Sequence, residues 1–267
     1  MSARGVLKAL PTLLRVGVSE AVAYRAEVFV WVLSTTMPFI SMALWTAVAR
    51  HEPVGRYDAK DFVSYFLAVF VVRQLTGAWA AWQINYEVRQ GTLAMRLLRP
   101  ISPLWSYAAE NLGGIPLRIL VVLPVLLFSV FQVGPGGVPQ TAWGWALVVP
   151  ALLGGWLIAF LANVLIGAAS FFIESSNRLL DIWFALFLVC SGYLYPVELF
   201  PPALRHVLDW LPFRYQISLG AQLMTNTHSL EVALGLLARQ WLWVGALFVL
   251  AVGAWTRGLK RFAAFGG

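Results

Sequence analysis

Long apolar stretches place the strongest limit on what this chain can fold into. A helix needs about twenty mostly apolar residues to cross the roughly 30 Å hydrocarbon core of a bilayer. With 60% hydrophobic and 12% charged residues among 267, the chain has too few charges to cover a soluble globule. We therefore predict an all-α integral membrane protein with one transmembrane domain over residues 1–267. The predicted spans are residues 28–49, 62–84, 115–131, 143–172, 180–195 and 234–255.

Prolines and glycines modify two of these predicted spans. Pro38 is expected to bend the first span. The segment 143–172 is too long for one upright span, and Pro150 and Gly154-Gly155 are available as breaks. The apolar connection 132–140, rich in glycine and proline, is predicted to be a turn.

The segment 85–114 is too charged to lie in lipid, and it separates the second span from the third. Arg89, Thr92, Arg96 and Arg99 follow a helical spacing that places them on one side, which predicts an amphipathic helix on the membrane surface. Pro100 should end this helix, because it disfavours the helical conformation in the residue before it. A second short helix is predicted over residues 104–112. On pattern alone, a loop that only lies at the membrane surface explains the segment equally well.

Two further segments are too polar or too interrupted to cross. Residues 2–24 predict an interfacial N-terminal helix. Residues 197–229 predict two short helices that form a re-entrant hairpin in the outer leaflet before the sixth span. No signal-peptide pattern is evident, so we expect the mature protein to begin at its own N-terminus.

The distribution of Lys and Arg predicts the orientation. The richer set, with twelve members, contains both terminal segments and the segment 85–114, and the opposite set has six. The positive-inside rule makes the richer set and both termini cytoplasmic. The richer set is Arg4, Lys8, Arg15, Arg25, Arg89, Arg96, Arg99, Arg118, Arg178, Arg257, Lys260 and Arg261.

Short motifs across most of the chain resemble one family of membrane transporters. Glu87, Arg89, Gly91, the run 97–100 (LLRP) and the run 109–113 (AENLG) are similar to the cytoplasmic loop of type-2 ABC transporter permeases. The motifs resemble those of the ABC export permease subfamily of about this length. The run 211–213 (LPF) after Pro201, and Trp255, Arg257-Gly258 and Lys260-Arg261, show the same resemblance. The sequence departs from the pattern at Leu219-Gly220, where a proline is expected.

The resemblance implies a division of labour between subunits. The chain would be the permease of a bacterial plasma (inner) membrane exporter, paired with a second permease, identical or related, above two copies of an ABC ATPase subunit. ATP and Mg would bind to the ATPase, with no cofactor in this chain, and a hydrophobic or amphipathic drug, lipid or peptide would move outward. The ATPase-coupling residues would be Glu87, Arg89, Gly91, Arg96, Leu98, Arg99 and Pro100.

The residues themselves give no indication of catalysis. The chain contains no G-x-x-x-x-G-K-[ST] motif with which to bind ATP phosphates. His51, His206 and His228 are separated, which predicts no metal site, and no catalytic triad can be placed at one membrane depth. Basic residues are not clustered as nucleic-acid binding would require, so we predict neither an enzyme nor a nucleic-acid partner.

Arg73 lies near the middle of the second predicted span, where a charge is costly and is often functional. We predict that it lines a translocation path with Trp79 and Trp183, whose flat rings could contact a substrate, although packing or interface anchoring explains each residue as well. An ion-coupled secondary transporter is the alternative class. It would require an internal repeat and further ionisable groups at this depth, and neither is detected.

Overall fold

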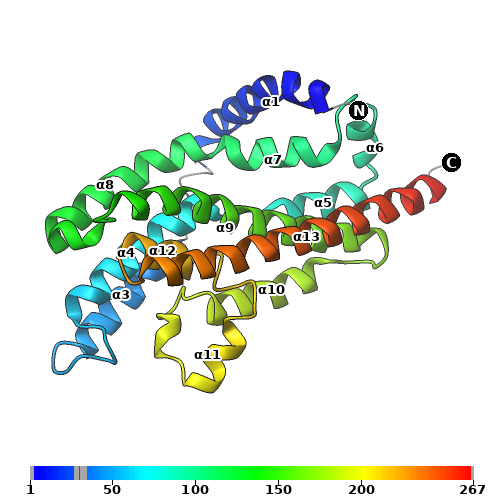
Figure 1. The fold of residues 1–267 in the computed structure, drawn as a ribbon. Helices are drawn as coiled ribbons and strands as arrows, with labels where there is room; N and C mark the ends of the chain where they lie inside the picture. The colour runs from blue at the N-terminus through cyan, green and yellow to red at the C-terminus, as the bar shows by residue number, and fades with distance from the viewer. Residues whose placement is uncertain (1–2, 27–29, 31–34, 266–267) are drawn as a thin grey trace.

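A computed structural model describes residues 3–26, 30 and 35–265, and it is built from helices (Figure 1). Apart from one two-residue bridge between Val54 and Tyr57, the described residues form no β-structure. Four helical stretches are long and apolar enough to cross a membrane: Ala59–Arg89, Pro103–Val133, Ala142–Phe171 and Leu230–Phe262. The chain is therefore all-helical with four candidate spans among the described residues.

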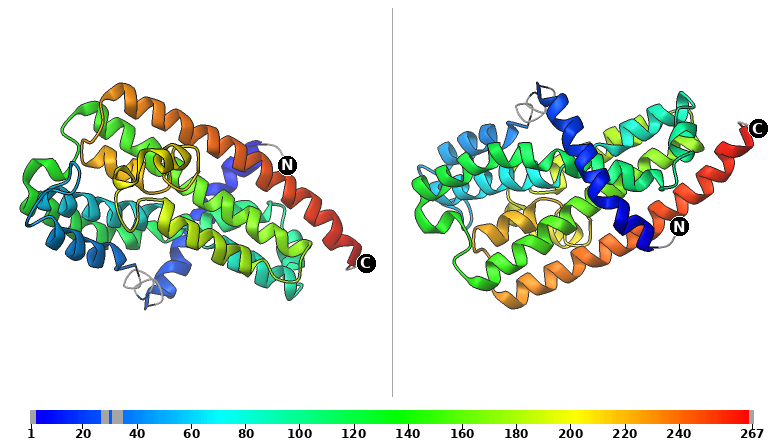
Figure 2. Two further views of the ribbon diagram at one scale, coloured as in Figure 1. Left: turned by 90° about the horizontal axis from the view of Figure 1, so that it is seen from below. Right: turned by 90° about the horizontal axis from the view of Figure 1, so that it is seen from above.

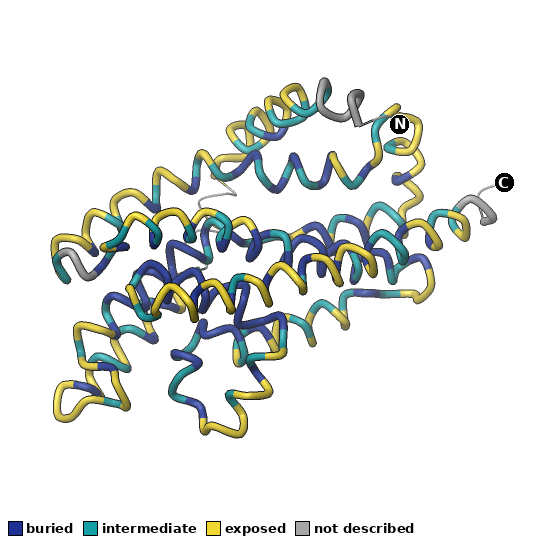
Figure 3. The backbone as a smooth tube through the Cα atoms, viewed as in Figure 1, coloured by how far each residue is buried: buried dark blue, intermediate teal, exposed yellow. Residues whose placement is uncertain are grey.

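These four stretches divide into two central, mostly buried ones and two peripheral, mostly exposed ones (Figure 3). Ala59–Arg89 and Ala142–Phe171 are each 67% buried in their most apolar part, whereas Pro103–Val133 and Leu230–Phe262 are 22% and 28% buried. In a membrane, the exposed apolar faces of the peripheral stretches would meet lipid or a partner. The central pair holds the core, which includes the fully buried rings of Phe62, Tyr65 and Phe66.

The second predicted span is a broken helix. Helix α4 (Ala59–Thr76) begins with a reciprocal cap, in which the side chains of Asp58 and Asp61 each accept from the other's backbone N–H. It ends at Gly77, whose backbone is extended, and α5 (Ala80–Arg89) starts three residues later. The predicted second span, residues 62–84, lies within the candidate span Ala59–Arg89, but its helix is interrupted after Thr76, where polar groups of other helices bind the backbone.

Helices α7 (Pro103–Gly113) and α8 (Ile115–Val133) make up the next candidate span. Pro103 lies in the first turn of α7, where a missing N–H is tolerated, so the predicted helix over 104–112 is confirmed with slightly wider limits. Helix α1 (Ala3–Ala23) packs against α7 and crosses over it in the view from above (Figure 2). The two backbones meet at Gly17 and Gly113, where a Cβ on Gly113 would lie 2.3 Å from the carbonyl carbon of Gly17.

Helix α9 (Ala142–Ala168) is one uninterrupted helix that continues into the short 3₁₀ helix η2 (Ala169–Phe171). Thr141 caps it by accepting a hydrogen bond from the N–H of Gly144 at 3.1 Å. Pro150 and Gly154-Gly155, expected as possible breaks, lie inside the helix. The glycines instead allow close packing, because Gly154 lies against Gln240 and Gly155 against the backbone of Tyr215 and Gln216.

Helix α13 (Leu230–Phe265) packs along α9 and contains the predicted sixth span, but it is much longer than residues 234–255. Its C-terminal end lies at the same end of the molecule as α6 (Leu93–Leu97) and the start of α1 (Figures 1 and 2). The turn predicted at residues 132–140 contains the 3₁₀ helix η1 (Gly134–Gly137) at the opposite end.

Two predicted spans correspond to helices shorter than a bilayer requires. Helix α3 (Met37–Val48) packs against α4, and Pro38 lies in its first turn, so it starts the helix and does not bend it. Residues 28, 29 and 31–34 of the first predicted span lie outside the described residues. Helix α10 (Asn177–Cys190) has 14 residues, a length of about 21 Å at 1.5 Å per residue. It covers only part of the predicted fifth span, because Gly192 turns the chain with a φ of 85°.

The segment before α13 folds into the 3₁₀ helix η3 (Val197–Leu199) and the short helices α11 (Pro202–Leu208) and α12 (Ser218–Met224). Every residue of α12 is buried, and the helix packs against α4 and α9. Its Gln222 is hydrogen-bonded to Glu198, Arg214 and His228, so a polar network occupies this buried position (distance from Gln222 Oε1 to His228 Nε2, 2.9 Å).

Candidate functional site

The charged loop after the second span consists of two helical pieces, not one amphipathic helix. Helix α5 ends at Arg89, a turn follows, and α6 covers five residues. Gly91 in the turn has a φ of 72°, a conformation that side chains rarely adopt, and this breaks the helix predicted over residues 89–99. Helix α6 ends at Leu97, shortly before Pro100. The loop therefore turns back at α6 and leads into α7.

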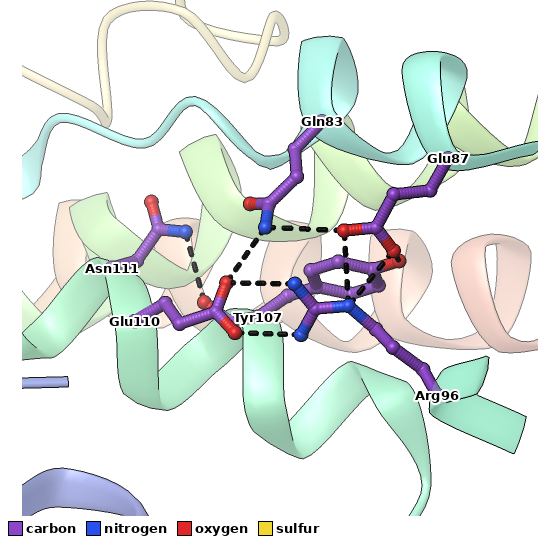
Figure 4. A network of polar contacts seen from close by, with 6 residues as sticks. All are labelled: Gln83, Glu87, Arg96, Tyr107, Glu110 and Asn111. Carbon is purple, nitrogen blue, oxygen red and sulfur yellow. Dashed lines mark hydrogen bonds and ion pairs between the residues drawn. The ribbon is translucent and has the colours of Figure 1, made fainter. Parts of the chain in front are cut away.

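Arg96 joins the three helices of this loop (Figure 4). Its Nε lies 2.8 Å from Oε2 of Glu87 on α5, and its Nη1 lies 2.6 Å from Oε1 of Glu110 on α7. The three side chains are only 16%, 12% and 20% exposed. The sequence placed Arg96 on a polar face with Arg89 and Arg99, but the structure turns it inward, where one guanidinium bridges two carboxylates.

Two neutral side chains complete this network. The hydroxyl of Tyr107 donates to Oε2 of Glu87 at 2.6 Å, and the guanidinium of Arg96 lies 4.6 Å from the centre of the Tyr107 ring. Gln83 donates to Oε2 of Glu110 at 2.8 Å and to Glu87. Burial acts to lower the pKa of Arg96, but hydrogen bonds to Glu110 and Glu87 outweigh it and raise this pKa. We call these five residues, Gln83, Glu87, Arg96, Tyr107 and Glu110, the loop network.

Glu20 on helix α1 interacts electrostatically with charged residues of the loop. Burial, and then the nearby charge of Glu110, raise the pKa of Glu20 on α1, while Arg96 and Arg99 oppose this shift. Together with the contact between Gly17 and α7, this places α1 against the same loop.

The outer side of the loop is exposed and partly apolar. Leu93 is fully buried and anchors α6, whereas Met95 and Leu98 are 67% and 79% exposed. Arg99 and Pro100 are exposed beside them. Exposed apolar residues in a segment too charged to lie in lipid are typical of a protein contact.

The loop is also attached to the turn between α9 and α10. Asn85 donates from Nδ2 to Oγ of Ser176 at 2.7 Å, and both side chains are buried. Arg89 is exposed at its surface and donates to the backbone carbonyl of Glu174. Of the predicted coupling residues, the structure thus brings Glu87 and Arg96 into contact, while Arg89 contacts a different turn.

Arg73 lies four residues before the break in the second span, and Arg118 on α8 lies beside it. Arg118 donates from Nη1 to the carbonyls of Gln74 and Gly77, at 3.0 and 3.4 Å. On the other side of the break, the N–H groups of Trp79 and Ala81 donate to the side chains of Asn111 and Asn163. Arg73 lies near the midpoint of the candidate span Ala59–Arg89, and Arg118 lies in the first turn of α8, next to the end of α7. Arg118 is buried in the protein, and its place on the cytoplasmic side stays a prediction.

The two tryptophans predicted to line a path have different neighbours. Trp79 is 44% exposed, and its ring lies 4.6 Å from the Arg118 guanidinium. Trp183 lies on α10 and packs against Phe213, with ring centres 4.6 Å apart. Arg73 contacts Phe187 on the same helix as Trp183, at 5.2 Å from the ring centre. Arg73 is thus near elements that carry both tryptophans, and a path between them stays a prediction.

Several residues of these sites were not selected from the sequence. Glu110 and Tyr107 follow Arg96 on a different helix, so no local spacing pairs them with it. A usable signal existed for Asn163, an isolated polar residue in an otherwise apolar helix, since polar groups in spans usually have partners. Arg118 carried the same signal. The described residues contain no group of three His, Cys, Asp or Glu side chains that could hold a metal.

The long apolar helices, joined by shorter polar segments, are those of a multi-pass membrane protein. Residues 31–266 match the sequence profile of the ABC-2 family transporter proteins, and the chain belongs to this family of transporter permeases. Members of this family carry no catalytic activity of their own, and ATP binding lies in an ATPase partner. The search of curated proteins found no match to an individual relative.

Proposed function

We propose that this chain is the membrane-spanning subunit of an ABC exporter in a bacterial plasma membrane. It pairs with a second permease, identical or related, above two ATPase subunits, and it moves a hydrophobic or amphipathic substrate outward. Family membership supports the ABC permease class over an ion-coupled secondary transporter. In this proposal α3 and α10, with the residues next to them, complete six spans, and the segment 197–229 forms the re-entrant hairpin on the outer side.

The observation that carries this proposal is the loop network. Arg96 ties α6 to α5 and to α7, which form the adjoining ends of the candidate spans Ala59–Arg89 and Pro103–Val133. A force applied to α6 by an ATPase would therefore reach both spans through short, charge-assisted contacts and not through a flexible loop. Glu87 and Arg96 have the role of transmitting this force, and Gly91, Leu98, Arg99 and Pro100 lie at or near the contact surface. Arg89 would carry the same movement to the α9–α10 turn.

The experiment introduces a charge into the proposed contact surface. Leu98→Asp should abolish co-purification with the ABC ATPase subunit, because Leu98 is 79% exposed and would meet the partner. The melting temperature of the chain alone should not change, since no packing is lost. Gln132→Asp is the matched control, because Gln132 is exposed in the last turn of α8, and this end of α8 lies at the opposite end of the molecule from α6 (Figure 1). Retention of the ATPase by Leu98→Asp at the level of the control would contradict this docking surface.

A further inference from the structure

Two guanidinium groups lie together at the break in the second span. A Cβ built on Gly77 would be 3.0 Å from Nη1 of Arg73 and 3.7 Å from Nη1 of Arg118, so both groups surround one point of the backbone. Their charges are close enough to interact with each other. None of the ion pairs formed by the described residues includes either arginine. Two adjacent positive charges thus lie at the break in a candidate span, and no carboxylate of the described residues forms an ion pair with either of them.

The contacts of the two arginines are with neutral groups. Arg118 holds the carbonyls of Gln74 and Gly77 and stacks on Trp79, and Arg73 lies over Phe187 and beside the hydroxyl of Tyr193. Carbonyls and aromatic faces stabilise a cation, but they do not neutralise it. Because intramembrane charges are usually paired, the pair of arginines indicates a negatively charged group that comes from outside these residues.

The donors of Arg118 that do not bind the break face a glycine. The hydrogen bonds of Arg118 to the break use Nη1, while Nε and Nη2 point toward Gly114, where a Cβ would lie 3.7 Å from each of them. The same Cβ would lie 3.8 Å from the ring of Trp79. The missing side chain of Gly114 therefore leaves the remaining donors of Arg118 accessible.

An apolar hollow begins one helical turn away. It has a volume of about 200 Å³ and is lined by Leu75, Leu112, Ile115, Leu152, Leu153 and Trp156. Ile115 and Arg118 are three residues apart on α8 and so lie on the same side of the helix. Leu75 directly follows Gln74, whose carbonyl Arg118 holds.

We propose that Arg73 and Arg118 bind the anionic head group, a phosphate or a carboxylate, of an amphipathic molecule whose apolar part occupies the hollow. The planar fork of a guanidinium suits both oxyanions. This inference extends the proposed function, since it names the chemistry that the membrane interior of the permease recognises. The molecule is either a transported amphiphile or a membrane lipid, which share this chemistry.

Binding is tested on the purified chain in an uncharged detergent, without an ATPase. Dodecyl phosphate is the probe, dodecyltrimethylammonium is its cationic counterpart, and inorganic phosphate lacks the apolar part. Arg73→Gln should weaken dodecyl phosphate binding about tenfold or more, the change in Kd expected when a charge-assisted hydrogen bond is lost. Arg239→Gln is the matched control, because Arg239, like Arg73, lies over an aromatic ring, that of Trp210, but on α13 away from the break.

A second variant separates binding from folding, since Arg118→Gln would also remove the partner of two backbone carbonyls. Gly114 has helical backbone angles, so Gly114→Ala should keep or raise stability while its methyl group reduces access to Arg118 and weakens binding several-fold. Equal dodecyl phosphate affinity in Arg73→Gln, Gly114→Ala and Arg239→Gln would overturn the site. If the unchanged chain bound dodecyltrimethylammonium as tightly as dodecyl phosphate, the claim that the site binds an anionic head group would be refuted. If it bound inorganic phosphate as tightly, the claim that the ligand needs an apolar part would be refuted.

Native mass spectrometry distinguishes the two sources. An anionic phospholipid that stays with the unchanged chain and is lost from Arg73→Gln identifies a membrane lipid. Dodecyl phosphate binding without a retained phospholipid identifies an exchangeable, transported type of molecule. Because no ATPase takes part, failure to bind while Leu98 still governs ATPase association would reject this site alone, and the reverse result would reject only the proposed coupling.

Discussion

Replacing Arg96 by alanine leaves Glu87 and Glu110 without the guanidinium that joins them. Removing one partner of a well-buried ion pair costs about 3–5 kcal/mol. Here the three side chains are 12–20% exposed, so water can partly solvate the stranded carboxylates and we expect a loss of about 2–3 kcal/mol. For a chain of this size, that loss lowers the melting temperature by roughly 5–10 °C.

Two further variants separate charge from position. Arg96→Met together with Glu87→Gln and Glu110→Gln removes all three charges, so no uncompensated charge remains and most of the lost melting temperature should return. Arg99→Ala is the control on the same loop, because Arg99 is exposed and the melting temperature should stay within about 1 °C of the unchanged chain.

Thermal unfolding of the purified chain and ATP-driven transport in vesicles that contain its ATPase are measured on the same variants. Arg96→Ala should lose transport, and the neutral triple variant should recover stability but not transport, since its contacts are weaker and less directional. An Arg96→Ala chain that melts like Arg99→Ala would refute the reasoning, because the loop network would then not hold α6 in place.

Three other changes test separate parts of the fold. Gly113→Ala should detach α1 from α7 and lower the melting temperature, because its Cβ would lie 2.3 Å from the backbone of Gly17. In the control Gly245→Ala, whose Cβ would have no atom within 4 Å, the free energy of unfolding should rise by up to about 1 kcal/mol. Equal melting temperatures of the two variants would contradict the close contact. In a Cys190→Ala background, an impermeant maleimide should label Gln132→Cys in intact cells and Glu174→Cys only after permeabilisation, and the opposite pattern would reverse the proposed orientation. Burial lowers the pKa of His228, and the charge of Glu198 opposes this shift, so the unfolded chain binds more protons than the folded chain in mildly acidic solution. The free energy of unfolding should therefore fall as the pH decreases below the ordinary His pKa. The melting temperature of His228→Asn should depend less on pH in this range, and an unchanged dependence would show that His228 is not responsible.

The sequence was sufficient for the features that depend on composition and local spacing. Helix α9 and the apolar part of α13 are found where continuous apolar residues predicted them, and α7 begins at a proline suited to a first turn. The family was also recognisable, because its motifs are short runs of adjacent residues such as 97–100.

Features that depend on distant residues could not be read in this way. The helical spacing of Arg89, Arg96 and Arg99 predicted one polar face, but Gly91 breaks that helix and Glu110, on another helix, draws Arg96 inward. The residues around Gly77 are apolar enough for an unbroken span. The break is stable only because side chains of other helices bind its backbone groups, and the sequence around Gly77 does not reveal those distant partners.

The break between α4 and α5 has a consequence for the order of membrane insertion. The backbone groups that lack helical partners at the break are bound by the side chains of Asn111, Arg118 and Asn163. Asn163 lies 82 residues after its partner Ala81 in the sequence. While the chain leaves the ribosome, the segment Ala59–Arg89 thus reaches the bilayer before its partners exist. Since unsatisfied backbone groups are costly in lipid, this segment should stay at the translocon, or as a continuous helix, until α9 arrives and the break can form.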